Sequence, residues 1–319
     1  MSSDCKSRRR ENKGSEEVDR ISNLPDEVIH EILALLNSPR EAAKASILSS
    51  TWFRLWRSYP ILEFHDTQFK STQSVKGFVS TAREKFSRRS DGTLIPMKAV
   101  RIKFNVQKKW PLEICSAFLD DMLELVANRS HPPQEIDIAA EFDKNIGRTL
   151  NFNGTGAYSI PRGLLLPKSK HQFRLKSLKL TNCSFDQFKD VNLDINPFVS
   201  LGSSLRGLSL SELSFPAGEG GGGGLILNSI IAGASCLQYL SLYAIVGTRR
   251  LRVRNLRNLR SLRFLQFLVE DLEITGVPFL ENLYMTGAPL GGDFVVSSMP
   301  NLRVLTIHSE KFRLSNSAH

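Results

Sequence analysis

Apolar side chains near the N-terminus recur with helical spacing. Leu24 and Pro25 precede a predicted helix, and Pro25 is expected at its first position because its fixed φ suits the first turn. A second short helix is predicted from Pro39, and a third with Ser49 or Ser50 as its N-cap. The first helix carries Ile29, Ile32, Leu33 and Leu36 on one face, which Val28 and Leu35 widen, and the third helix carries Trp52, Phe53, Leu55 and Trp56. Three short helices cannot bury all of these side chains among themselves, so part of this surface is expected to meet another domain or another protein.

Helical and strand-like patterns then alternate. An amphipathic helix is predicted over residues 75–86, and a half-buried strand over 100–104. A second helix is predicted over 114–126 and a short strand over 136–138. Further along, the glycine run 220–224 lacks the Lys-Ser/Thr of a phosphate loop and is predicted to be a flexible loop.

The pattern L-x-x-L-x-L recurs through the C-terminal half of the chain. The middle leucines of its six copies are Leu178, Leu208, Leu240, Leu262, Leu283 and Leu305. The last three steps are 22, 21 and 22 residues, inside the ~20–29-residue period of leucine-rich repeats. A fainter series at 251–253, 272–274 and 294–296 predicts that these repeats return through a short strand rather than a helix. One repeat cannot bury its own apolar edge, so the copies are expected to stack into a curved solenoid.

The helical stretch resembles the F-box in its plant form. The resemblance rests on Leu24-Pro25, Ile32-Leu33, Ser46-Ile47-Leu48-Ser49, Trp52 and Leu55-Trp56. The family usually carries Lys-Arg before the first Trp, where this chain has Ser50-Thr51, so weaker attraction to an acidic adaptor is expected. The pattern from Val100 onward resembles the leucine-rich-repeat region of plant F-box proteins. Many relatives carry a further C-terminal FBD domain, which is expected to be missing here.

The resemblance implies an α+β protein: an N-terminal three-helix F-box, then a leucine-rich-repeat α/β solenoid whose last repeats are strand-rich. The expected divisions are a disordered basic tail over 1–18, the F-box over 19–64 and the solenoid over 72–319. Within the tail, the basic run 6–10 is either a nuclear import signal or a solvated charge cluster.

By the same resemblance, the F-box docks on a Skp-type adaptor and through it on a cullin. The chain would then be the substrate-recognition subunit of an SCF (Skp-cullin-F-box) E3 ubiquitin ligase. The residues carried over as facing the adaptor or supporting that face are Leu24, Pro25, Ile29, Ile32, Leu33, Leu48, Trp52, Leu55 and Trp56.

The third, fifth and seventh positions of each repeat are expected on the concave face of the solenoid. Tyr239, Tyr243, Arg263 and Tyr284 fall on these positions in three successive repeats. Because Tyr and Arg are enriched at binding hot spots, these four residues are the candidate target-binding set. The alternative is that scattered exposed tyrosines are ordinary on a sheet.

Charge adds a competing hypothesis. The net charge is +10, and seven arginines lie between Arg249 and Arg263 with no acidic residue among them. This run supports a basic nucleic-acid-associated protein, an attraction to an acidic or phosphorylated target, or simply a solvated face. Only Arg263 falls on the expected concave face, so nucleic acid is the less favoured partner. A leucine-rich-repeat scaffold no longer coupled to a ligase is the other alternative.

The remaining composition points away from enzymes and membranes. The sequence shows no nucleophile elbow, phosphate loop or zinc-ligand spacing, so a non-catalytic adaptor without cofactors is expected. No apolar run approaches the ~18 residues of a membrane span, and no secretory signal is visible. The four cysteines lack disulfide or metal spacing, which is typical of reduced thiols in the nucleus or cytoplasm.

Overall fold

A computed structural model gives the fold. It describes residues 20–21, 23–36, 39–57, 61–65, 98–106, 112–127, 133–142, 158–161, 165, 175–188, 198, 204–215, 222–266, 269–287, 293–297 and 299–308. The chain divides into two compact units, Met1–Tyr59 and Pro60–His319, named here the helical unit and the repeat unit. The predicted tail over 1–18 and the predicted helix over 75–86 lie outside the described residues.

The helical unit contains α1 (Asp26–Leu35), α2 (Pro39–Ala45) and α3 (Ser50–Arg57), as the sequence predicted. Pro25 was expected inside α1, but its ψ of 146° is extended, so it is the N-cap and its carbonyl accepts the first helical hydrogen bonds. The Ser49 hydroxyl accepts a hydrogen bond from the Trp52 amide at 3.3 Å, which confirms Ser49 as the cap of α3.

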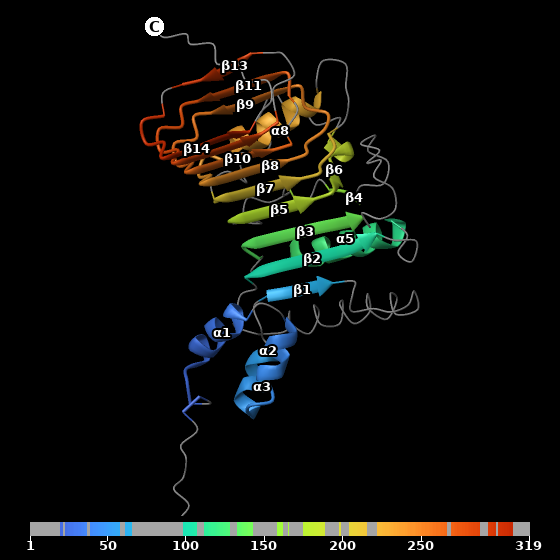
Figure 1. The fold of residues 1–319 in the computed structure, drawn as a ribbon. Helices are drawn as coiled ribbons and strands as arrows, with labels where there is room; N and C mark the ends of the chain where they lie inside the picture. The colour runs from blue at the N-terminus through green and yellow to red at the C-terminus, as the bar shows by residue number, and fades with distance from the viewer. Residues whose placement is uncertain are drawn as a thin grey trace, which may run out of the picture. The chain divides into compact units, whose positions relative to one another are not determined.

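In the described part of the repeat unit, nine parallel strands form one long sheet in the order β1-β2-β3-β5-β7-β8-β10-β12-β14 (Figure 1). Successive strands pair without a shift of register, so equivalent positions lie side by side across the sheet. The strands are β1 (Ile61–His65), β2 (Ala99–Val106), β3 (Glu135–Phe142), β5 (Ser177–Thr181), β7 (Gly207–Ser211), β8 (Tyr239–Tyr243), β10 (Ser261–Leu265), β12 (Asn282–Thr286) and β14 (Val304–His308). The fold class predicted from the sequence, a helical domain followed by a leucine-rich solenoid, is confirmed.

The fainter apolar series forms a second parallel sheet, β13-β11-β9, from β9 (Arg250–Arg254), β11 (Asp271–Thr275) and β13 (Phe294–Val296). The last repeats therefore return through strands, as predicted. A two-stranded sheet joins β4 (Tyr158–Ser159) and β6 (Cys183–Ser184), and a short 3-10 helix covers Asp186–Phe188.

Two of the helices that the structure describes, α5 and α8, belong to the repeat unit. Helix α5 (Leu112–Ala127) contacts β2, and Phe118 meets Phe64 of β1 edge to face with ring centroids 5.8 Å apart. Helix α8 (Gly222–Gly233) corrects the predicted glycine loop, because the helix already begins at Gly222. Its buried Leu227 and Ile231 anchor it in the core, which outweighs the low helix propensity of glycine.

The leucines of the repeat point inward in β5 to β12, where they are almost fully buried. A residue in the left-handed region directly follows β5, β7, β8, β10 and β12 of the long sheet, and another directly follows β9 and β11 of the second sheet. These residues are Asn182, Glu212, Ala244, Asn255, Gln266, Gly276 and Gly287. The last strand, β14, differs. Its Leu305, the middle leucine of the sixth repeat, is 55% exposed.

Among the described residues, no helix is both long enough and apolar enough to cross a membrane.

Candidate functional site

Helix α1 carries two apolar faces. Ile29 and Leu33 are fully buried and pack towards α3, whose Trp52 and Leu55 are also buried. His30 lies with them, its Nε2 atom 3.2 Å from the Leu55 carbonyl oxygen. This face and α3 build the small core of the helical unit.

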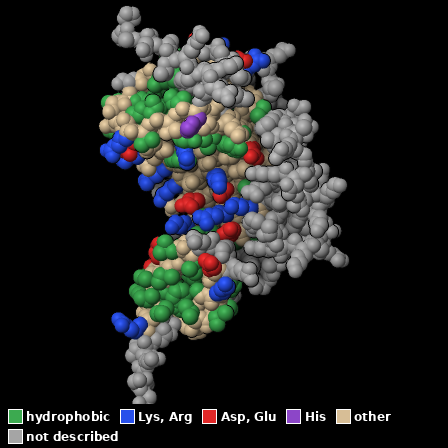
Figure 2. Space-filling model, viewed as in Figure 1, with side chains coloured by type: hydrophobic (Ala, Val, Ile, Leu, Met, Phe, Trp, Pro, Cys, Tyr) green, Lys and Arg blue, Asp and Glu red, His purple; other side chains and the backbone are tan. Residues whose placement is uncertain are grey.

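The second face of α1 carries Val28, Ile32 and Leu35, which are spaced by four and three residues and so share a stripe. Val28 is 42% exposed and Leu35 is 77% exposed, while Ile32 is half-buried. Figure 2 shows apolar side chains covering much of the visible face of this unit. The other exposed large apolar residues of the helical unit are Ile21, Ile47, Leu48 and Phe53. So much exposed apolar surface on a small unit is typical of a protein-binding site.

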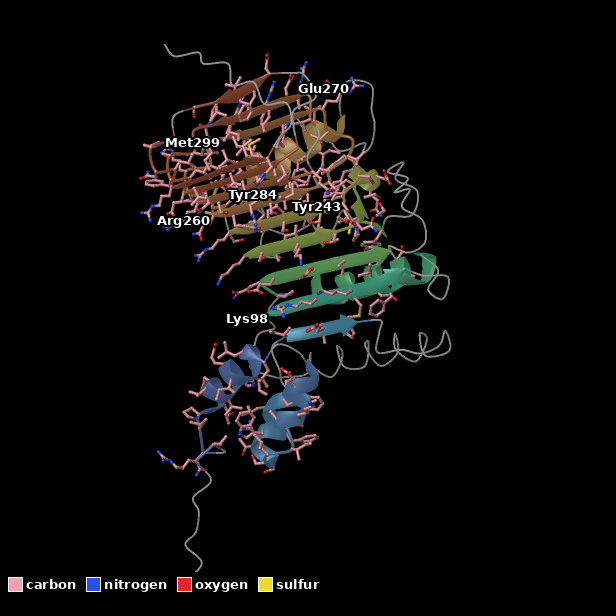
Figure 3. The ribbon with its side chains drawn as sticks, in the orientation of Figure 1. Lys98, Tyr243, Arg260, Glu270, Tyr284 and Met299 are labelled. Carbon is pink, nitrogen blue, oxygen red and sulfur yellow. The ribbon has the colours of Figure 1, made fainter. Side chains whose placement is uncertain are left out.

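The face of the long sheet opposite the buried leucines carries the second candidate surface. Tyr239 and Tyr243 lie on one face of β8, and Arg263 lies on the same face of the neighbouring β10. The Arg263 guanidinium carbon is 5.6 Å from the centroid of the Tyr284 ring on β12, a cation–π contact. Figure 3 shows Tyr243 and Tyr284 on this part of the sheet. The structure therefore brings the four predicted target-binding residues onto one face of three adjacent strands.

The arginine run has a different role from either candidate surface. Most of its members lie on or next to β9 and pair with carboxylates of the next repeat. The ion pairs are Arg249–Glu270 at 3.6 Å, Arg250–Asp271 at 2.8 Å, Arg252–Glu273 at 4.0 Å, Arg254–Glu273, and Arg260–Glu281 at 3.4 Å. The first four pairs connect successive repeats along or next to the ladder from β9 to β11, and Arg260–Glu281 connects the residues that precede β10 and β12. The run is therefore an inter-repeat set of ion pairs rather than an open cationic surface.

Arg254 and Glu273 form the tightest of these pairs. The guanidinium donates two hydrogen bonds to the carboxylate, one from Nε to Oε1 at 2.5 Å. The hydrogen bonds from Arg254 hold the pKa of Glu273 below its usual range, and the same contact raises the pKa of Arg254. Both groups therefore stay charged across the physiological range.

Reactive groups do not gather in the described parts of the chain. No cluster of three or more His, Cys, Asp or Glu with metal-ligand geometry occurs among the described residues. Cys183 is free and buried, and burial raises its pKa to about 12, so it stays a neutral thiol at physiological pH. Tyr158 is buried and donates a hydrogen bond to Asp120 at 2.7 Å. Both side chains lie in the interior of the repeat unit.

Known proteins match both units. A model of the F-box domain matches residues 21–64. A model described as the leucine-rich repeats of FBD-associated F-box protein At5g56370 matches residues 149–316, just over half of the chain. This chain belongs to the plant F-box/leucine-rich-repeat family.

Individual relatives match shorter segments. F-box/LRR-repeat protein 13 of Arabidopsis thaliana is 41% identical over 70 residues, which is 22% of this chain and 15% of the relative. The A. thaliana F-box/FBD/LRR-repeat protein At4g03220 is 31% identical over 159 residues, 48% of this chain and 29% of the relative. The A. thaliana F-box/FBD/LRR-repeat protein At5g53840 is 39% identical over 69 residues, 22% of this chain and 15% of the relative. The chain thus matches less than a third of the length of each of these relatives.

The nine residues predicted to face or support an adaptor fall into three groups. Ile29, Leu33, Trp52 and Leu55 form the core of the F-box and can only support a binding face. Leu24, Ile32 and Trp56 are half-buried at its edge. Pro25 and Leu48 are exposed, and Leu48 is 60% exposed. The residue-by-residue roles remain predictions.

Part of this apolar surface was not predicted from the sequence, and neither were the acidic partners of the arginines. Leu35 and Ile47 are 77% and 84% exposed but were not among the predicted adaptor-binding residues. The spacing of Val28, Ile32 and Leu35 was the available signal for a second stripe. The sequence also contains a signal for the acidic partners of four arginines, because each acidic residue follows its arginine by 21 residues, the length of one repeat. These pairs of positions are 249 and 270, 250 and 271, 252 and 273, and 260 and 281.

Proposed function

We propose that this chain is the substrate-recognition subunit of an SCF E3 ubiquitin ligase, docking on a Skp-type adaptor through its F-box. The observation that carries the proposal is the exposed apolar stripe of α1 together with Ile47 and Leu48. Apolar side chains this exposed cost free energy in water, and burying each Leu-sized side chain against an adaptor contributes ~1.5–3 kcal/mol. The adaptor connects the chain to a cullin.

In this proposal the repeat unit recruits the target protein. Tyr239, Tyr243, Arg263 and Tyr284 offer aromatic surface and a cation on one sheet face, the composition found at binding hot spots. The chain itself is non-catalytic. It raises the effective concentration of its target near the ubiquitin-conjugating enzyme, and other subunits transfer the ubiquitin. We place this activity in the nucleus, the cytoplasm or both.

A pull-down with a purified plant Skp adaptor tests the proposal. The double variant Leu35→Asp/Leu48→Asp places one charge on the exposed stripe and one on the exposed Leu48, without touching the F-box core. We expect adaptor binding to fall at least about tenfold, because the two apolar contacts are lost and two carboxylates must be desolvated. Phe279→Asp in the repeat unit is the matched control, since Phe279 is 57% exposed and apolar. The control should bind like the wild type.

Two outcomes contradict the proposal. If the wild-type chain does not bind the adaptor, it acts as a leucine-rich-repeat scaffold without a ligase. If the double variant binds as well as the wild type, the exposed stripe is not the docking face.

A further inference from the structure

A single row of residues marks the start of the strands in the long sheet. Each member directly precedes a strand, and its amide donates a hydrogen bond to the carbonyl oxygen of the preceding member at 2.6–3.0 Å. The ladder holds these residues in line from β2 to β14. We call this set the strand-start row; its members are Lys98, Gln134, Lys176, Arg206, Gln238, Arg260, Glu281 and Arg303.

The strand-start row carries five basic residues and one acidic residue. All five basic side chains are exposed, and Arg260 pairs with Glu281 at 3.4 Å. The other four basic residues have no carboxylate partner among the described residues. Lys176 and Arg206 lie on neighbouring strands, about 4.8 Å apart in the direction of the hydrogen bonds. Within the described part of the chain, the row therefore holds more positive than negative charge along one side of the sheet.

The basic composition of the chain does not by itself explain why positive charges gather in the strand-start row. On β9 the same in-register stacking places an acid of the next repeat beside Arg250 and beside Arg252, as in the ion pair Arg250–Asp271. In the strand-start row the stacking instead places Lys176 beside Arg206, so like charges are neighbours. Figure 2 shows Lys and Arg side chains gathered where the middle strands begin, and Figure 3 shows Lys98 and Arg260 on that side. An anionic ligand would relieve the repulsion that the fold leaves in this row.

The neighbouring sheet face offers groups that suit a peptide. Tyr239 directly follows Gln238 of the row and is half-buried on the sheet face opposite the buried leucines. On the same face, Ser209 lies on the adjacent strand β7 and Ser177 on the next strand, β5. Hydroxyl and phenol groups bind peptide carbonyls and carboxylates. Glu281 and Glu135 interrupt the positive charge in or next to the row. A peptide can place a neutral residue opposite each of them, whereas a phosphate backbone carries a charge at every nucleotide. Protein is therefore the better match than nucleic acid.

We infer that the strand-start row, with Tyr239 beside it, binds an extended acidic segment of the target protein. The inference rests on the proposed function, since it names the chemistry by which the repeat unit selects its target. Electrostatic complementarity of this kind gives specificity and a fast, salt-sensitive association.

Fluorescence anisotropy on the full chain tests the inference. The probe is a fluorescein-labelled peptide of about fifteen residues that alternates Glu and Ser, and the same peptide with Gln in place of Glu is the reference ligand. The variant Lys176→Glu/Arg206→Glu reverses two neighbouring charges of the row. The variant Arg249→Glu/Arg257→Glu is the control, because it makes the same change in net charge at exposed residues near β9. Circular dichroism confirms that each variant folds.

We expect the Glu peptide, and not the Gln peptide, to bind the wild type. Lys176→Glu/Arg206→Glu should weaken binding about tenfold or more, and the control should stay within about twofold at ionic strength near 0.15 M. If both variants lose the same amount of affinity for the Glu peptide, the effect comes from net charge alone and the inference is overturned. Absence of binding to the Glu peptide, or tighter binding of a random DNA duplex, would also overturn it. Adaptor binding, measured on the same samples, reports separately on the proposed function.

Discussion

The helical unit and the repeat unit leave different kinds of side chain exposed. In the helical unit, large apolar residues such as Leu35 and Ile47 lie at the surface beside a core of only a few side chains. In the repeat unit, the repeat leucines of β5 to β12 are buried, and four cations of the strand-start row have no carboxylate partner among the residues that the structure describes. This difference is the basis for proposing two kinds of partner, one that buries apolar surface and one that neutralises charge.

The exception within the repeat unit is its last strand. Leu305 of β14 pairs in register with Leu283 of β12, yet Leu283 is 3% exposed and Leu305 is 55% exposed. Val304 and the β13 residues Val295 and Val296 are also exposed. This end of the sheet therefore resembles the helical unit in the kind of surface that it presents.

Replacing each of these two leucines by alanine gives the largest effect that we predict. Leu283→Ala should lower the free energy of unfolding by ~2–5 kcal/mol, because it leaves a cavity in a packed core. Leu305→Ala should lower it by less than ~0.5 kcal/mol, because the side chain is already in contact with water. Denaturant unfolding of the full chain, followed through the transition of the repeat unit, measures the change in free energy of unfolding for each variant. Equal losses would show that Leu305 is covered in solution and that the contrast along the sheet is wrong.

The sequence predicted the solenoid because its apolar pattern is strict. Each middle leucine from Leu178 to Leu283 is buried where the L-x-x-L-x-L pattern requires it. It did not predict that α8 begins inside the glycine run, because the tertiary packing of Leu227 and Ile231 overrides the local propensity of Gly222. Propensity is a local property, whereas this helix is stabilised by contacts distant in the sequence.

The candidate surfaces were less predictable than the fold. The nine predicted F-box residues include four that are buried, because a motif records which residues occur together without separating core from surface. The seven arginines looked like one cationic cluster, since their acidic partners lie a whole repeat away in the sequence. Only the register of β9 with β11 brings Arg252 beside Glu273. The strand-start row likewise becomes visible only when the strands are aligned.

The ion pairs of β9 and β11 give a smaller and pH-dependent effect. Because the pKa of Glu273 is lowered in the folded protein, its ion pair with Arg254 stabilises the fold above the ordinary pKa of a glutamate. That contribution is lost as the pH falls through the lowered folded-state pKa. Glu273→Gln should therefore reduce the unfolding midpoint at neutral pH but not at strongly acidic pH, where the wild type has lost the same pair.

Salt separates this effect from packing. In about 1 M salt the difference between Glu273→Gln and the wild type at neutral pH should shrink, because exposed ion pairs are screened. Leu283→Ala should keep its full effect under the same conditions. A Glu273→Gln difference that is independent of both pH and salt would mean that the side chain acts through packing rather than charge.

The smallest effect concerns the positions where the family usually carries Lys-Arg. Ser50 is exposed and Thr51 is half-buried in the first turn of α3. In Ser50→Lys/Thr51→Arg two cations face the proposed acidic adaptor, which should raise adaptor affinity about two- to fivefold at low salt. Cations near a helix N-terminus oppose the helix dipole at a cost of ~0.3–1 kcal/mol each, so the F-box should become slightly less stable. The matched neutral variant Ser50→Gln/Thr51→Gln should leave the affinity unchanged. Should the charged variant bind no more tightly than the neutral one, this turn of α3 does not face the acidic part of the adaptor, and apolar contacts alone would carry the docking.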